Sequence, residues 1–157
     1  MTPKKLPLAI VGIGNTLAGD DGAGVEVVRR LEKLVGSEEK VLLRVIEGDH
    51  FEVSDFLDRA ERFIFVDAVA GEVPGELTHS KDAPRAFSPS FHQTDISAVM
   101  RYLEEIEVAK PFPQWEIQGI TILPPEEIGE GLSPEVDKAV ETLCGKLLEI
   151  ISAICRK

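Results

Sequence analysis

The stretch of sequence that decides the fold is GIGNTLAGDDGAG, residues 12–24. An apolar run, residues 6–11, comes before it, and an amphipathic segment, residues 25–35, follows it. This order is typical of a strand, a glycine-rich turn and a helix. The stretch therefore predicts the first β–α unit of an α/β chain.

The glycines of this turn follow neither of the common phosphate-binding patterns. Leu17 stands where G-x-G-x-x-G requires its third glycine, and no lysine follows Gly19 as the P-loop requires. The turn instead places two carboxylates, Asp20 and Asp21, at the start of the helix, where the helix dipole attracts anions. Two aspartates would repel a pyrophosphate there, so the turn favours a cation or a polarised water. The alternative is that an aspartate simply caps the helix.

Strands and helices alternate along the rest of the chain. We expect further strands over residues 41–46, 62–69, 76–79 and 116–123, and helices over residues 51–59, 92–106 and 134–154. Residues 62–69 are almost entirely apolar, as in a strand that is covered on both faces. Ser133 and Pro134 are typical of an N-cap followed by proline at the first helical position. Together these patterns predict a three-layer α/β/α fold with a mostly parallel central sheet.

The composition is that of an ordinary globular protein. The 157 residues are 43% apolar and 29% charged, and we expect a single domain over residues 1–157. No run approaches the roughly 20 apolar residues of a membrane span, and the N-terminal apolar segment lacks a signal-peptide cleavage site. We therefore expect a cytoplasmic protein without membrane insertion. The net charge of −11 argues against nucleic acid as a partner. Cys144 and Cys155 fit apolar positions of the last helix, where we expect buried, reduced thiols.

Three side chains are the best candidates for chemistry. Asp21 follows the first strand, and Asp67 lies near the end of the third, where a carboxylate is costly to bury without a partner. If these strands are neighbours, both carboxylates open onto one crevice at the carboxyl edge of the sheet. His92 would complete a set of two carboxylates and one imidazole, which suits zinc or nickel with open positions for water or substrate. Taken singly, each of the three is more often a cap or turn residue.

Other catalytic groups have weaker support. His50 follows the second strand and would line the same crevice, whereas His79 is expected at the surface. No G-x-S-x-G motif supports a serine triad, and both cysteines fit a helix core better than a nucleophile.

The motif G-I-G-N-x-L-x-x-D-D-G-x-G-V, residues 12–25, resembles the opening signature of the hydrogenase maturation proteases. Later motifs of that family are matched by FVDAV (65–69), SFHQ (90–93), IQGI (117–120) and GLSPEV (131–136), so the resemblance covers nearly the whole chain. The resemblance implies a three-layer α/β/α endopeptidase. Members of the family remove a C-terminal extension from the large subunit of nickel-iron hydrogenases.

The same resemblance implies roles for individual residues. The two acidic ligands of the family fall on Asp21 and Asp67 and its histidine falls on His92, so these three groups carry both metal binding and catalysis. They are expected to bind nickel that is already inserted in the precursor, and zinc or cadmium would occupy the site in vitro. The nickel is either a Lewis acid or only a recognition element, and the general base stays unassigned. Asn15 and Gly48 are implied as substrate-binding residues, although Asp49-His50 replaces the small residues usual after Gly48.

The function that this resemblance implies is the processing of a nickel-iron hydrogenase large-subunit precursor after nickel insertion. Two alternatives keep the same residues. One is a non-catalytic, metal-binding chaperone for a metalloenzyme precursor, and the other is a small-molecule hydrolase or nucleotide-binding domain on the same fold. The acidic turn argues against a nucleotide, and only an activity test separates the protease from the chaperone.

Overall fold

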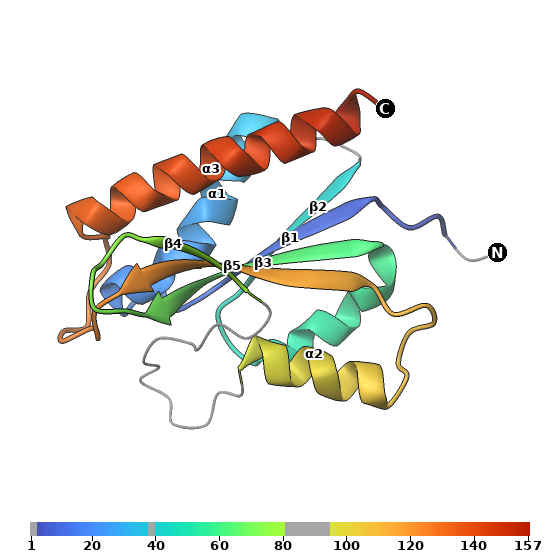
Figure 1. Cartoon of the computed structure of the whole chain (residues 1–157), viewed down its shortest axis with the longest axis horizontal. Coiled ribbons are helices and arrows are strands. Elements are labelled where there is room, and N and C mark those ends of the chain that lie inside the picture. The colour runs from blue at the N-terminus through green and yellow to red at the C-terminus, as the bar shows by residue number, and fades with distance from the viewer. Residues whose placement is uncertain (1–2, 38–39, 81–94) are drawn as a thin grey trace.

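A computed structural model describes residues 3–37, 40–80 and 95–157, and its centre is a five-stranded sheet in the order β2-β1-β3-β5-β4 (Figure 1). The strands are β1 (Leu8–Ile13), β2 (Val41–Ile46), β3 (Arg62–Ala70), β4 (Leu77–Ser80) and β5 (Gln114–Ile122). Strand β1 pairs in parallel with β2 and with β3, and β3 pairs in parallel with β5. The edge strand β4 pairs antiparallel with β5. The predicted mostly parallel sheet is confirmed.

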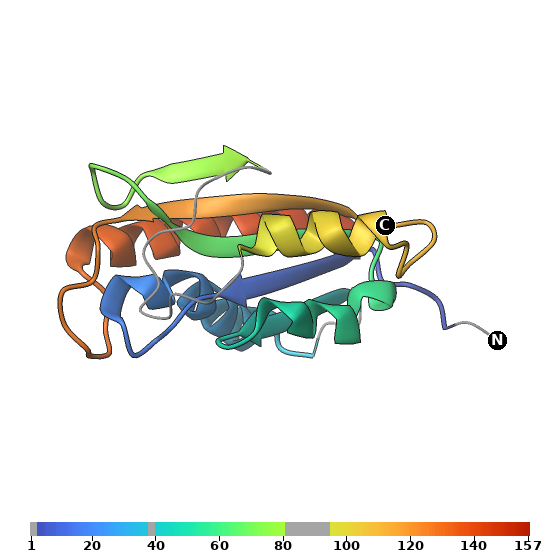
Figure 2. The ribbon, with the colours of Figure 1, turned by 90° about the horizontal axis from the view of Figure 1, so that it is seen from below.

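Helices cover both faces of this sheet. Figure 1 shows α1 and α3 on one face and α2 on the other, and Figure 2 shows α2 in front of the sheet with two short 3-10 helices, η2 and η3. These elements are α1 (Ala23–Val35), α2 (Ile96–Glu105), α3 (Pro134–Cys155), η2 (His50–Asp55) and η3 (Leu57–Arg59). The predicted three-layer α/β/α arrangement is therefore confirmed. Among the helices within the described ranges, none combines the length and the apolar character needed to cross a membrane.

The pleat of each strand sends alternate side chains into two separate cores. On β3, Ile64 and Val66 pack in the core that α1 and α3 cover, while Phe63 and Phe65 pack in the core that α2 covers. Both sets are fully buried, which explains why this strand reads as a continuous apolar run. Asp67 continues the series of Phe63 and Phe65, so its side chain lies on the α2 face of the sheet.

Two elements differ most from the expectations. The first strand spans Leu8–Ile13 rather than residues 6–11, because Leu6 makes only an isolated bridge with Ala60 while Ile13 still pairs with Ile46. The helix expected over residues 51–59 is instead η2 and η3, since Phe56 adopts φ −134° and interrupts the helical backbone.

The remaining helices agree with the sequence patterns. Helix α2 begins at Ile96, where the Asp95 side chain caps it by accepting a hydrogen bond from the Ser97 N–H at 2.9 Å. Its expected start at residues 92–94 lies outside the described residues. Helix α3 carries both cysteines as thiols, but only Cys144 is buried, and burial raises the pKa of its thiol. Cys155 is partly exposed near the helix end, so the expectation of two buried thiols is wrong for that residue.

Candidate active site

The two predicted carboxylates lie where the direction of the chain through the sheet reverses. From β1 the chain crosses to β2 on one side and then returns to β3 on the other side, so β1 and β3 flank the switch point. Asp67 follows Val66, which pairs with Gly12 of β1. Asp21 lies in the 3-10 helix η1 (Gly19–Gly22), which follows β1 and contacts β3. The expected neighbouring position of the two strands is thus found.

Both carboxylates are buried at this edge. Asp21 is 0% exposed and Asp67 is 3% exposed. Removing a carboxylate from water costs roughly several kcal/mol of free energy. The surroundings of the carboxylate must offset this penalty. Gly22, and not Asp21, is the N-cap of α1, so capping does not explain why Asp21 is there. Two buried acids at one strand edge favour a role in chemistry.

The glycines near Asp21 let helix α1 approach the sheet closely. A Cβ on Gly24 would lie 2.1 Å from the Val66 carbonyl oxygen, and one on Gly12 would lie 2.3 Å from the Gly24 carbonyl oxygen. A Cβ on Gly14 would lie 2.1 Å from the Asp21 carbonyl oxygen, and the φ of +157° at Gly14 also disfavours other residue types. These glycines therefore allow the backbones of η1 and α1 to pack closely on β1 and β3, and this packing brings η1 to the carboxyl end of β3.

Asp20 has a different role from its neighbour. Its carboxylate accepts hydrogen bonds from the Ser133 N–H at 2.7 Å and from the Ser133 hydroxyl at 2.8 Å. Ser133 is the N-cap of α3, as the sequence predicted, but its hydroxyl donates to Asp20 instead of capping the helix. The pair fastens the turn after β1 to the start of α3. Sequence reasoning missed this contact because 113 residues separate the two partners.

We expect Asp20→Ala to lower the free energy of unfolding by about 1–3 kcal/mol, because it removes two hydrogen bonds to a charged group. We also expect a several-fold loss of the precursor processing that the sequence resemblance implies, since the turn that carries Asp21 loses its anchor. Ser133→Ala keeps the backbone N–H donor and should show a smaller loss of both quantities. Processing is measured well below the melting temperature of each variant. Full activity of folded Asp20→Ala would show that Asp20 does not position the turn.

The two histidines within the described residues differ in their surroundings. His50 is 2% exposed and begins η2, so it lies beyond the carboxyl end of β2, at the same edge as Asp21. His79 is exposed, as expected, and its Nε2 lies 3.4 Å from Oε2 of Glu116. Burial raises the pKa of Glu116, but Arg62 and His79 together hold it below its ordinary value. His79 on β4 and Arg62 on β3 therefore lie on either side of Glu116 on β5.

The two predicted substrate-binding residues have contrasting environments. The Asn15 side-chain oxygen accepts a hydrogen bond from the Leu17 N–H at 3.0 Å, and the Asn15 N–H donates to the Asp21 carbonyl at 3.2 Å. Asn15 therefore shapes the turn around Asp21. Gly48 is exposed, and a Cβ there would meet only Glu52 Oε1 at 3.3 Å, so packing does not demand glycine. Substrate binding by Asn15 and Gly48 stays a prediction.

The third predicted ligand, His92, lies outside the described residues. Within residues 3–37, 40–80 and 95–157, no group of three or more His, Cys, Asp or Glu side chains could hold a metal ion. Asp21 and Asp67 come from adjoining strand ends and carry oxygen ligands, so they fit two positions of the expected donor set. The complete set of Asp21, Asp67 and His92 stays a prediction.

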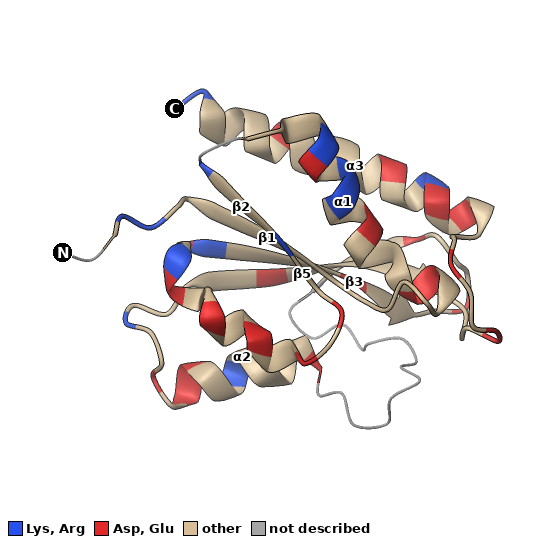
Figure 3. Cartoon of the chain, turned by 180° about the vertical axis from the view of Figure 1, so that it is seen from behind, with Lys and Arg blue, Asp and Glu red and all other residues tan. Residues whose placement is uncertain are grey.

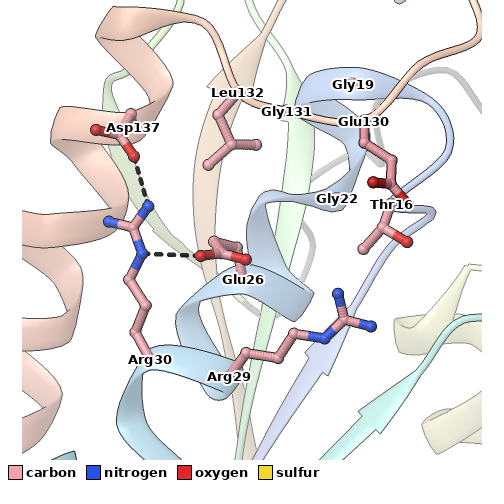
Figure 4. Close-up of a pocket in the computed structure, with 10 residues that line it drawn as sticks. All are labelled: Thr16, Gly19, Gly22, Glu26, Arg29, Arg30, Glu130, Gly131, Leu132 and Asp137. Atoms are coloured by element: carbon pink, nitrogen blue, oxygen red, sulfur yellow. Dashed lines mark hydrogen bonds and ion pairs between the residues drawn. The ribbon is translucent and has the colours of Figure 1, made fainter. Parts of the chain in front are cut away.

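A hollow of about 290 Å³ opens beside the turn, on the side of the sheet that α1 and α3 cover (Figure 4). Arg30 crosses its wall, where it donates hydrogen bonds to Asp137 and to Glu26. The hydrogen bond to Asp137, helped by Glu26, raises the pKa of Arg30 above its ordinary value despite partial burial. These bonds link α1 to α3, and Arg30 is therefore part of the scaffold. Asp67 points to the opposite face of the sheet.

Fold and site together define a class: a three-layer α/β/α protein with an acidic site at the switch point of its sheet. The family model for hydrogenase maturation protease, HycI, matches residues 25–150. A Methanocaldococcus jannaschii protein, itself provisionally named a hydrogenase maturation protease, is 30% identical over an alignment of 172 positions, gaps included, which covers 98% of this chain and 99% of the relative. The chain therefore belongs to the hydrogenase maturation protease family, whose members are endopeptidases.

Two further similarities cover most of the chain. The solved structure of the NiFe hydrogenase maturation protease HycI from Thermococcus kodakarensis KOD1 has a TM-score of 0.68 and 25% identity, and the match covers 98% of this chain and 94% of that one. The Pyrococcus furiosus protein FrxA is 28% identical over 144 residues, which cover 85% of this chain and 96% of the relative.

Proposed function

We propose that this endopeptidase removes the C-terminal extension of a nickel-iron hydrogenase large-subunit precursor after nickel has been inserted. The observation that carries the proposal is the burial of Asp21 and Asp67 at adjoining strand ends, 0% and 3% exposed. In this proposal the nickel arrives with the precursor and is part of the substrate. Family membership and the match of the acidic motifs support the same reaction.

The residues of the chain bind and orient the precursor in this proposal. Asp21, Asp67 and His92 contact the nickel of the precursor, which supplies a cationic anchor and Lewis acidity when it is bound. Asp21 is held by backbone packing against Gly14, and Asp67 by its place in β3. Ligands held this firmly place the neighbouring peptide bond in a reproducible position. A carboxylate that is not bound to the metal accepts the proton of the attacking water as general base.

Specificity follows from the same contacts. A precursor without nickel cannot form the bonds to Asp21 and Asp67, so the binding energy that orients its peptide bond is missing. The enzyme would then spare a precursor whose metal centre is incomplete. This selectivity separates the proposal from a general peptidase activity.

The test is mass spectrometry of a nickel-loaded large-subunit precursor from the same source after incubation with the protein. We expect a C-terminal fragment that is released only from the nickel-loaded precursor, because only that form carries the metal that the carboxylates bind. Nickel-free precursor is the matched control. Binding without cleavage would favour the chaperone, and equal cleavage of both forms would contradict nickel recognition.

A further inference from the structure

Two loops at the carboxyl edge of the sheet are paired by their backbones. The Leu17 carbonyl accepts a hydrogen bond from the Gly129 N–H, and the Gly129 carbonyl accepts one from the Gly19 N–H, each at 2.8 Å. Ala18 and Gly129 thereby form a parallel bridge. The turn after β1 and the connection between β5 and α3 are thus held as one surface.

This pairing displays large apolar side chains to solvent. Leu17 and Ile128 stand directly before the two bridged residues, one on each loop. Leu17 is 56% exposed and Ile128 is 92% exposed, and Leu123, just after β5, is 49% exposed. Single exposed leucines are common, but three large exposed apolar side chains on two loops held together by backbone hydrogen bonds favour an interaction surface. We refer to Leu17, Leu123 and Ile128 as the edge patch.

The surroundings of the edge patch are acidic. Residues 123–133 include three exposed glutamates and no Lys or Arg, and Figure 3 shows acidic residues along this connection. A hollow of about 460 Å³ opens here between the two loops. Its wall includes Pro124, Pro125, Glu126 and Glu127. A Lys or Arg side chain matches this wall, since its apolar stem packs on prolines while its cationic end reaches carboxylates.

We propose that the edge patch is a docking surface for a segment of the hydrogenase precursor that carries apolar side chains next to Lys or Arg. This inference rests on the proposed function and adds a contact apart from the scissile peptide. The Asp21 N–H donates to the Ala18 carbonyl at 3.2 Å, so Leu17 and Asp21 belong to one turn. A precursor seated on the edge patch is therefore held beside the turn that carries Asp21.

The experiment measures kcat and KM for processing of the nickel-loaded precursor, with Kd of the same precursor by calorimetry. Ile128→Ser should raise KM and Kd about tenfold or more, with the loss in KM rather than in kcat, because truncation of a central apolar contact weakens docking. Leu34→Ser is the matched control, since Leu34 is 62% exposed near the end of α1 and should change neither constant. Melting temperatures check that both variants are folded.

The charge contribution is tested with paired glutamates. Glu126→Gln combined with Glu127→Gln should raise KM several-fold at low salt, and added salt should reduce the difference from the native protein. Glu104→Gln combined with Glu105→Gln on α2 removes the same charge from another exposed site and should leave KM unchanged.

The outcomes separate this inference from the proposed function. If the native protein cuts the precursor and Ile128→Ser keeps the native KM and Kd, docking at the edge patch is wrong and the proposed function stands. A loss in kcat alone would also overturn docking. A native protein that neither binds nor cuts the nickel-loaded precursor would overturn both proposals.

Discussion

Asp21→Asn is expected to lower the rate of precursor processing by on the order of 10³ while the protein stays folded. A carboxamide is a weaker ligand than a carboxylate for a divalent metal. Asparagine has nearly the same size and shape as aspartate, so it fits the buried position of Asp21, which is 0% exposed. The melting temperature should therefore stay near that of the native protein. The measurement is the initial rate of fragment release from nickel-loaded precursor, together with a thermal melt.

Asp20→Asn is the matched control for this prediction. It removes the same charge from the adjacent residue, but an asparagine oxygen still accepts a hydrogen bond from Ser133. Processing should fall only slightly in this variant. Full activity of Asp21→Asn would remove Asp21 from the mechanism, and a large drop in its melting temperature would make Asp21 a structural residue.

The fold class could be predicted because strands that are buried on both faces are visible in the sequence as continuous apolar runs. The run over β3 has no polar residue between Phe63 and Val66, since helices cover both faces. The two acids could be predicted as site residues for a related reason, because each follows an apolar run and the carboxyl ends of parallel strands share one edge. The order β2-β1-β3, which makes β1 and β3 neighbours, could not be obtained from periodicity and came with the structure.

Contacts between distant segments were beyond the sequence for a physical reason. Nothing local marks Asp20 as the partner of Ser133, because a hydrogen bond between loops depends on how both loops close. The hydrogen bond between the Leu17 carbonyl and the Gly129 N–H could not be predicted either, because almost every residue type offers the same backbone groups. The 3-10 form of η2 and η3 was missed because apolar spacing alone does not distinguish it from an α-helix.

Gly24→Ala is expected to lower the free energy of unfolding by about 3 kcal/mol or more, a large effect for one methyl group. Its Cβ would lie 2.1 Å from the Val66 carbonyl oxygen and 2.5 Å from that of Ile13. Both carbonyls belong to strands β1 and β3, whose ladders hold the backbone in place. The clash can therefore be relieved only by moving α1 away from the sheet. Urea denaturation measures the loss.

Gly145→Ala is the control, because Gly145 also lies within a helix but has no atom within 4 Å of a new Cβ. The free energy of unfolding of this variant should rise by about 0.5–1 kcal/mol, since alanine favours the helix.

Displacement of α1 in Gly24→Ala also moves η1, and with it Asp21, away from Asp67. The rate of processing per folded molecule of Gly24→Ala should therefore fall about tenfold or more, because a displacement of about 1 Å is enough to disturb the geometry of a site. Native activity per folded molecule would show that the close packing of α1 on β3 serves stability alone.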